Sequence, residues 1–82
     1  MKVTDVRIRK VDRGTALKGV ATVTFDEMFA VHDIKIIKGE KGMFIAMPSR
    51  KTEEGMYIDI AHPINSDARN YITDEILKAF EE

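Results

Sequence analysis

Residues 17–25, with the sequence LKGVATVTF, decide the fold class of this 82-residue chain. Apolar or small residues at the odd positions alternate with partly polar residues at the even positions, which is the two-residue period of a β-strand. The even positions include Val20 and are only weakly polar. We therefore expect both faces of this strand to be partly covered.

Four other stretches show strand signals, and turn residues such as Gly, Pro and Asp separate them. With the first stretch, the predicted strands are Val3–Val11, Leu17–Phe25, Met28–Ile37, Met43–Met47 and Met56–Ala61. The connections between them are short, whereas parallel strands need crossovers of about a dozen residues or more. The sequence therefore predicts an antiparallel, largely meander sheet.

The alternation also predicts which side chains share a face of each strand. In the first strand Val6 and Ile8 lie on one face, and the charged residues lie on the other. In the third strand Phe29 and Val31 are predicted to lie opposite a set that comprises Ala30, His32, Ile34 and Ile36. The stretch 43–47 is wholly apolar, which is typical of a short central strand.

The hydrophobic period changes after Pro63. Asn65 or Ser66 can cap a helix whose first turn contains Asp67. Apolar residues then recur at three- and four-residue spacing and form the stripe of an amphipathic helix: Ala68, Ile72, Ile76, Ala79 and Phe80. The spacing predicts a helix over about residues 66–81.

Together these elements predict a single α+β domain covering residues 1–82, with an antiparallel sheet of four to five strands and one C-terminal amphipathic helix. A chain of this length buries only about 60% of the surface that its unfolded form exposes. We therefore expect marginal stability as a monomer and association of the chain with a partner.

The composition excludes several classes of protein. With no cysteine there is no disulfide framework, thiolate metal cluster or cysteine nucleophile. No apolar run approaches the ~20 residues of a membrane span, and charges interrupt the first residues, where a signal peptide would have its apolar core. We expect a cytoplasmic protein that does not associate with membranes.

The net charge of −1 conceals a strong asymmetry along the chain. Residues 1–51 contain 11 Lys and Arg against 6 Asp and Glu, whereas residues 52–82 contain 2 against 8. The first part therefore carries a net charge of +5 and the second a net charge of −6. A near-neutral total argues against nucleic-acid binding, but a basic sheet portion can still form a local binding patch.

Arg50 and Lys51 are the strongest candidates for contact with nucleic acid. They lie in a predicted loop that joins two apolar strands, where cations can reach phosphates. The neighbouring Ser49 and Thr52 can donate additional hydrogen bonds. The alternative, which composition alone favours, is a solvated turn with two ordinary charges.

Arg7, Arg9 and Lys10 form a supporting basic group in the first strand. Arg7 and Arg9 alternate with apolar residues, so they share a strand face that contacts nucleic acid or simply faces water. Another basic group follows later in the chain and comprises Lys35, Lys38 and Lys41.

The two histidines raise the question of a metal site or acid–base catalysis. Two imidazoles and two carboxylates would meet if neighbouring strands brought together His32, Asp33, Asp59 and His62. Their spacing matches no zinc motif, so structural hydrogen bonding is the favoured interpretation and a metal-dependent enzyme is a third hypothesis. The chain also lacks a glycine-rich phosphate loop. We expect no catalytic residue, metal, cofactor or small-molecule substrate.

Four blocks of sequence, read in chain order, form a specific pattern: VTDVR at 3–7, FAVHDIK at 29–35, GMFIAMPSRKT at 42–52 and DIAHPINS at 59–66. In this order, and over essentially the whole chain, they closely resemble the stage V sporulation protein G family of bacteria. The resemblance implies homodimers that associate through strands of the sheet. It also implies regulators that bind DNA, and in several cases RNA, and that influence gene expression, sporulation and septum placement.

Within this family the basic pair implicated in nucleic-acid contact matches Arg50 and Lys51, which strengthens the functional interpretation of that pair. The sequence and the resemblance together predict a non-enzymatic, homodimeric regulator that binds DNA or RNA and acts in gene expression, sporulation and asymmetric septum formation. The alternative is an adaptor in cell division that binds other proteins through its acidic helix and does not bind nucleic acid directly.

Overall fold

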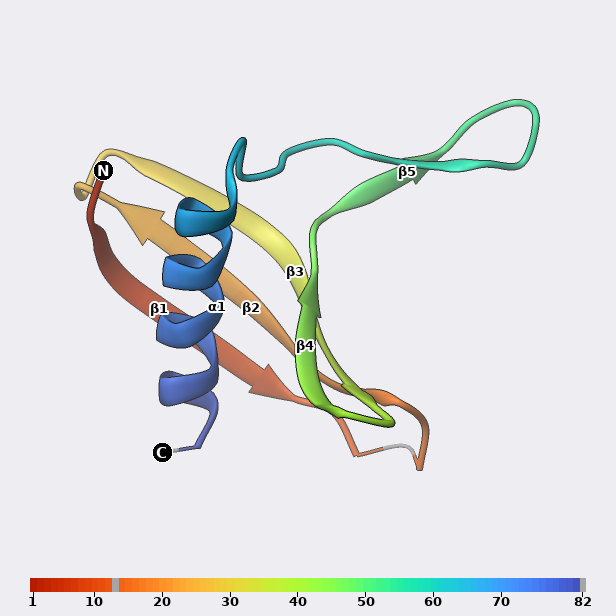
Figure 1. Ribbon diagram of the computed structural model, residues 1–82, viewed down its shortest axis with the longest axis horizontal. Coiled ribbons are helices and arrows are strands. Elements are labelled where there is room, and N and C mark those ends of the chain that lie inside the picture. The colour runs from red at the N-terminus through yellow and green to blue at the C-terminus, as the bar shows by residue number, and fades with distance from the viewer. Residues whose placement is uncertain (13, 82) are drawn as a thin grey trace.

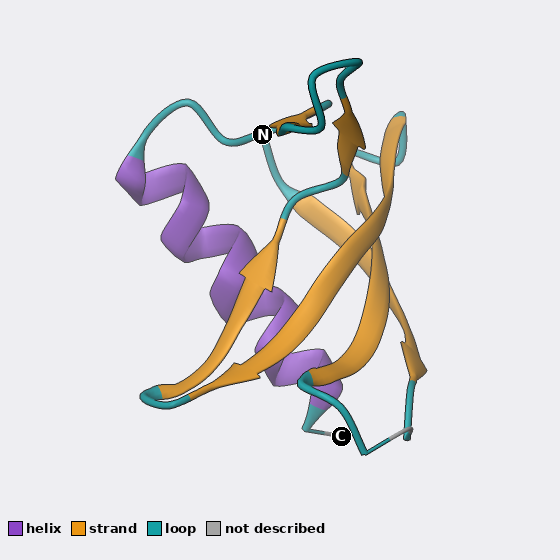
Figure 2. Ribbon diagram, turned by 90° about the vertical axis from the view of Figure 1, so that its right-hand side faces the viewer, coloured by secondary structure: helices purple, strands orange, loops and turns teal. Residues whose placement is uncertain are grey.

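The computed structural model describes residues 1–12 and 14–81. Its elements, in chain order, are β1 (Val3–Lys10), β2 (Leu17–Phe25), β3 (Phe29–Gly39), β4 (Gly42–Ala46), β5 (Ser49–Lys51), β6 (Tyr57–Asp59) and α1 (Ser66–Phe80). The first four strands form an antiparallel sheet in the order β1-β2-β3-β4, and β5 pairs with β6 in a separate two-stranded ribbon. The helix lies across one face of the larger sheet (Figures 1 and 2), which confirms the predicted α+β class.

The hydrophobic core lies between the sheet and the helix. The odd positions of β2 are buried and the even ones half-buried, apart from half-buried Leu17 at its start, so the predicted alternation and the partial cover of both faces are confirmed. Helix α1 contributes Ile72 and Ile76, the two buried residues of its apolar stripe. Among the residues that the structure describes, the buried core consists of Ala21, Val23, Phe25, Ile34, Ile36, Ile45, Met47, Ile72 and Ile76.

Two polar contacts fix the start of the helix. Asn65 is the N-cap, and its side-chain oxygen accepts a hydrogen bond of 2.8 Å from the backbone N–H of Ala68. Arg69 donates a hydrogen bond of 3.3 Å to the backbone carbonyl of Ile45, which ties the first turns of α1 to β4. Of the two caps that the sequence allowed, the structure therefore selects Asn65.

We expect Asn65→Ala to lower the free energy of unfolding by about 1 kcal/mol, because it leaves a backbone N–H at the helix start without its acceptor. Denaturant unfolding followed by circular dichroism measures the change. Asn70→Ala is the matched control, because Asn70 lies exposed within the same helix. Equal effects of the two substitutions would contradict the capping role.

A β-bulge in β3 makes one predicted face assignment wrong. Between the pairs Ala21↔Ile34 and Val23↔Val31, β2 advances by two residues and β3 by three. The extra residue falls next to Asp33, whose φ of 62° lies in the left-handed region. The bulge shifts the alternation, so Val31, Ile34 and Ile36 all point towards the helix instead of lying on opposite faces.

The second half of the sheet also differs from the prediction. The strand predicted at 43–47 is not central, because β4 forms an edge of the four-stranded sheet. The segment predicted as a loop contains β5, and the strand predicted at 56–61 shortens to β6 and leaves the main sheet. These two short strands form a ribbon, here called the arm, that extends away from the body of the protein (Figure 1).

Candidate nucleic-acid interface

The face of the sheet opposite the helix is open and carries basic side chains from β1. Arg7 pairs with Thr22, and Arg9 pairs with Val20, so the predicted shared face of the two arginines is confirmed. Both arginines are exposed. Arg7 Nε donates a 3.1 Å charge-assisted hydrogen bond to the Asp5 carboxylate. This ion pair contributes little stability in water, and it leaves the other guanidinium N–H groups free to bind a ligand.

Lys35 on β3 completes a basic row across the open face. It pairs with Val20, which also pairs with Arg9 on its other side. Since neighbouring strands lie about 4.8 Å apart, the backbones of Arg9 and Lys35 lie about 10 Å apart. The sequence analysis placed Lys35 in a basic group but not in the site. Its orientation depends on the bulge at Asp33, which the residue pattern alone does not reveal.

The base of the arm turns this open face into a shallow groove. Arg9, Asp33 and Lys35 line it from the sheet, and Ser49 lines it from the start of β5. A neighbouring hollow on the same face is lined in part by Arg7, Thr22 and His32. Hydroxyl groups of Ser49 and Thr22 therefore lie beside the basic row, where they can donate hydrogen bonds to phosphate oxygens.

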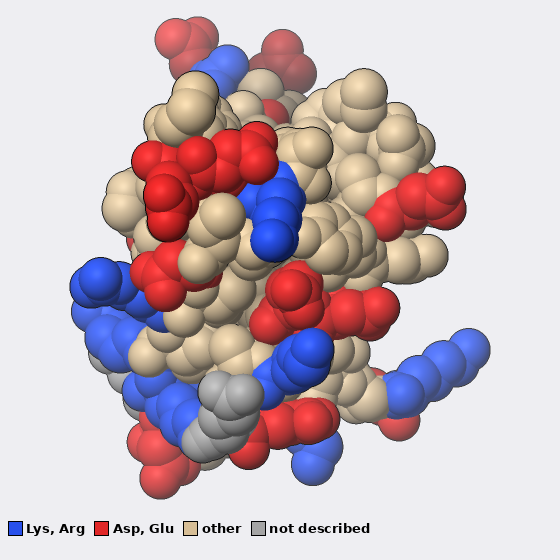
Figure 3. Space-filling model, turned by 90° about the vertical axis from the view of Figure 1, so that its left-hand side faces the viewer, with Lys and Arg blue, Asp and Glu red and all other residues tan. Residues whose placement is uncertain are grey.

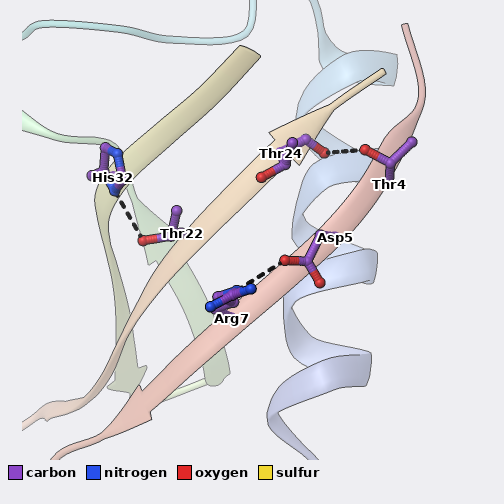
Figure 4. A network of polar contacts seen from close by, with 6 residues as sticks. All are labelled: Thr4, Asp5, Arg7, Thr22, Thr24 and His32. Atoms are coloured by element: carbon purple, nitrogen blue, oxygen red, sulfur yellow. Dashed lines mark hydrogen bonds and ion pairs between the residues drawn. The ribbon is translucent and has the colours of Figure 1, made fainter. Parts of the chain in front are cut away.

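A polar network spans the strands that carry the hollow (Figure 4). The Thr22 hydroxyl lies 3.3 Å from Nδ1 of His32, which joins β2 to β3. Thr4 donates a 3.3 Å hydrogen bond to the Thr24 carbonyl and joins β1 to β2. His32 therefore has a structural partner and at the same time lies on the basic face.

Arg50 and Lys51 lie on a strand, and not in the predicted loop. Arg50 pairs with Ile58, and Lys51 pairs with Tyr57. Consecutive strand residues point to opposite faces, so the two cations diverge and cannot bind one phosphate together. Glu53 and Glu54 follow in the turn at the end of the arm. Lys51 shares the ribbon face of Ser49, and Ser49 is one of the residues that line the groove on the open face.

Two other predicted site residues have structural roles away from the groove. Lys10 pairs with Gly19 on the helix side of the sheet, and its Nζ lies 5.3 Å from the centre of the Phe80 ring. Such a cation–π contact holds the lysine against α1. The Thr52 hydroxyl accepts a 3.2 Å hydrogen bond from the backbone N–H of Met56 and closes the turn of the arm. The structure thus separates Lys10 from Arg7 and Arg9.

The candidate metal ligands do not form a cluster. Within residues 1–12 and 14–81, the structure contains no group of three or more His, Asp or Glu side chains arranged to hold a metal ion. His62 Nδ1 lies 3.1 Å from the Pro63 carbonyl oxygen, which gives it a local backbone contact. Among the same residues, no helix has the length and apolar character needed to cross a membrane.

The helix has a different charge character from the open sheet face. Its first turn contains Asp67. Further along the helix, Oε2 of Glu75 lies 3.9 Å from Nζ of Lys78. Figure 3, which views the molecule from the left-hand side of Figure 1, shows acidic side chains interspersed with basic ones. The fold and the distribution of charge define a small α+β protein. The helix covers one face of the sheet, and the opposite face is uncovered and carries basic side chains.

The sequence pattern that defines the SpoVG family matches residues 1–82. A protein of Alkaliphilus metalliredigens is 62% identical over 80 residues, which cover 98% of this chain and 82% of the relative. A protein of Thermoanaerobacter sp. strain X514 is 59% identical over 81 residues, which cover 99% of this chain and 88% of the relative. A third, of Heliobacterium modesticaldum, is 52% identical over 82 residues, which cover 100% and 92%.

Each of these relatives is named "Putative septation protein SpoVG". This chain belongs to the SpoVG family, which confirms the resemblance identified from its sequence blocks.

Proposed function

We propose that this chain is a homodimeric cytoplasmic regulator that binds DNA or RNA through the open sheet face and acts in gene expression, sporulation and septum formation. Family membership and the names of the relatives support a role in sporulation and septation. The observation that carries nucleic-acid binding is the basic row formed by Arg9 and Lys35 on either side of Val20. No enzymatic step, metal or cofactor is part of this proposal.

Phosphates are the part of the ligand that this face fits. Guanidinium groups of Arg7 and Arg9 can bind phosphate oxygens with two parallel hydrogen bonds, while Lys35 adds a point charge. The acidic first turn of α1 disfavours insertion of the helix into the major groove. Binding therefore rests mainly on the nucleic-acid backbone, with affinity that falls steeply as salt is added.

Fluorescence anisotropy with labelled mixed-sequence DNA duplex and single-stranded RNA, titrated at several salt concentrations, tests the proposal. We expect saturable binding of at least one of these ligands at low salt and progressive loss of affinity as salt increases. Absence of binding to both at low salt would refute nucleic-acid binding. The mass in solution, measured alongside by sedimentation, tests the dimer independently.

The divergence of Arg50 and Lys51 predicts unequal effects of single substitutions in the arm. By strand alternation Lys51 lies on the ribbon face of Ser49, which lines the groove, whereas Arg50 lies on the opposite face. We expect Lys51→Ala to weaken binding several-fold at low salt and Arg50→Ala to change it less. The same anisotropy assay measures both variants, and unchanged affinity in the double variant would remove the pair from the interface.

An adaptor function in cell division is the second candidate, and the acidic residues of the helix favour it. Asp67, Asp74 and Glu75 lie on α1, where they can contact a basic partner surface. Retention of division proteins by the purified chain, together with no nucleic-acid binding at low salt, would favour this function over the first.

A further inference from the structure

The β-bulge in β3 places two consecutive side chains on the open face of the sheet. A regular strand would point His32 and Asp33 to opposite faces, yet both line the hollow beside Arg7 and Thr22. The φ of 62° at Asp33 is a strained backbone conformation for a residue with a side chain, although aspartate adopts it more readily than most. Bulges of this kind re-aim a side chain beside a functional site. The distortion of β3 thus places a carboxylate on the face of the basic row.

Asp33 lines both hollows of the open face, and it shares this position with Arg9 and Val20. Among the residues that the structure describes, its side chain forms no ion pair, although Arg9 and Lys35 line the same groove. A carboxylate repels phosphate, so a face that held only the nucleic-acid backbone would gain nothing from it. The Asp33 oxygens can only accept hydrogen bonds, and they therefore favour a ligand group that carries N–H donors.

The groove at the base of the arm also offers an apolar surface. It has a volume of about 270 Å³, and its apolar lining comes from Val20, Pro48 and Ile60. The backbone N–H of Ile60 donates a 2.7 Å hydrogen bond to the Pro48 carbonyl, which holds these two residues side by side. Apolar side chains, an acceptor and neighbouring cations are the three kinds of group that a nucleotide contacts through its ring face, its base edge and its phosphate.

Guanine is the base whose Watson–Crick edge fits a carboxylate. Its N1–H and exocyclic N2–H groups lie side by side, so the two oxygens of Asp33 can accept both hydrogen bonds in parallel, as carboxylates do from arginine. Adenine, cytosine, uracil and thymine each place one donor group beside an acceptor on this edge, and a carboxylate repels that acceptor. In a duplex the guanine edge is occupied by base pairing, so the base that enters the groove must be unpaired.

We propose that this groove binds an unpaired guanine of single-stranded RNA or DNA, with Asp33 accepting hydrogen bonds from N1–H and N2–H and the apolar lining packing against the ring. This inference rests on the nucleic-acid binding of the proposed function and specifies the class of ligand. Arg9 and Lys35 bind the adjacent phosphates. The phosphate contacts therefore supply most of the affinity, and Asp33 supplies the preference for one base.

Fluorescence anisotropy with labelled oligouridine strands that differ only at one central nucleotide tests the contact. That nucleotide is guanosine, adenosine or inosine, and inosine lacks only the exocyclic amino group of guanosine. We expect the guanosine strand to bind about tenfold more tightly than the adenosine strand, with the inosine strand intermediate. Oligothymidine strands with the matching deoxynucleotides repeat the comparison in DNA.

The outcomes separate this inference from the proposed function. Equal affinities for the guanosine and adenosine strands, in RNA and in DNA, would overturn the guanine site and leave phosphate binding intact. An inosine strand that binds as tightly as the guanosine strand would overturn the paired hydrogen bonds to Asp33. Absence of binding to every strand at low salt would instead contradict the proposed function itself.

Asp33→Asn provides a second test, with effects of opposite sign on the two strands. Asparagine also adopts the left-handed conformation, but it has one acceptor oxygen and no charge. We expect the variant to lose the preference for guanosine and to bind the adenosine strand a few-fold more tightly than wild type, because the repulsion of phosphate is removed. A preference as large as that of wild type would overturn the role of Asp33.

Asp74→Asn is the matched control for the change in charge. Asp74 is exposed on α1, which covers the other face of the sheet (Figure 2), so this variant should keep the preference for guanosine. Loss of the preference in the control as well would contradict a local contact at Asp33. Far-UV circular dichroism checks that both variants are folded, and the inosine comparison tests the same contact in the wild-type protein.

Discussion

Ile76→Ala is expected to lower the free energy of unfolding by about 3 kcal/mol, within the range of roughly 2–5 kcal/mol for removal of a buried isoleucine side chain. Ile76 is completely buried between α1 and the sheet, where it packs in the core with Ile36 and Ile45. Truncation leaves a cavity that the short helix cannot close without losing other contacts. A domain of this size has a total stability of only about 4–12 kcal/mol, so one substitution removes a large part of it.

Thermal and denaturant unfolding followed by circular dichroism measure this loss. A destabilisation of about 3 kcal/mol corresponds to a decrease in Tm of roughly 12–24 °C for a domain of this size. Lys78→Ala is the control on the same helix, because the Lys78 side chain is 77% exposed. It should change the stability by no more than about 0.5 kcal/mol. Similar effects of both substitutions would mean that the helix does not form the core described above.

The triple variant Arg7→Ala/Arg9→Ala/Lys35→Ala is expected to lose affinity for nucleic acid on the order of 100-fold at 0.1 M salt. Each phosphate contact contributes a slope of about 0.9 to the dependence of log affinity on log salt. Removal of three contacts therefore reduces that slope by about 2–3, and the difference from wild type narrows as salt increases. Anisotropy titrations between low and high salt measure both quantities.

A charge-matched control separates this local effect from a change in net charge. Lys2→Ala/Lys41→Ala/Lys78→Ala removes three charges from exposed positions away from the basic row. We expect it to weaken binding only a few-fold, through the loss of long-range attraction. If the control lost as much affinity as the open-face variant, binding would depend on overall charge and the basic row would not be the interface.

The sequence predicts local features of this fold best where one period continues without interruption. The alternation of β2 correctly identifies Ala21, Val23 and Phe25 as core residues, and the helical spacing correctly identifies Ile72 and Ile76. Period alone fails in β3, because the extra residue at Asp33 inverts the assignment of everything that follows it. Periodicity also does not determine the order of strands in the sheet, because an apolar strand such as β4 can lie at an edge when a helix covers one of its faces.

In the candidate interface too, residues on a regularly alternating strand could be placed from the sequence, whereas residues whose position depends on strand register could not. Arg7 and Arg9 could be placed on one face from their spacing, because β1 alternates regularly at these positions. Lys10 does not share the face of the two arginines, because it directly follows Arg9 and consecutive strand residues point to opposite faces. Lys35 could join the row only once the register of β3 was known. To predict that Arg50 and Lys51 point to opposite faces, one must know that β5 is extended. A strand of three residues within a turn-rich segment gives no clear sequence signal of this.

The bulge at Asp33 makes the two parts of β3 respond differently to a change in length. Conservative replacements of Ile34 or Ile36 keep each side chain on its present side of the sheet. Deletion of Asp33 would remove the extra residue and leave Val31 and Ile34 two positions apart, so both isoleucines would still face the helix. A one-residue insertion or deletion between Ile34 and Ile36 would instead turn one of these isoleucines towards water. We therefore expect natural variants of this domain to accept the loss of the extra residue at Asp33 more readily than a change of length between Ile34 and Ile36.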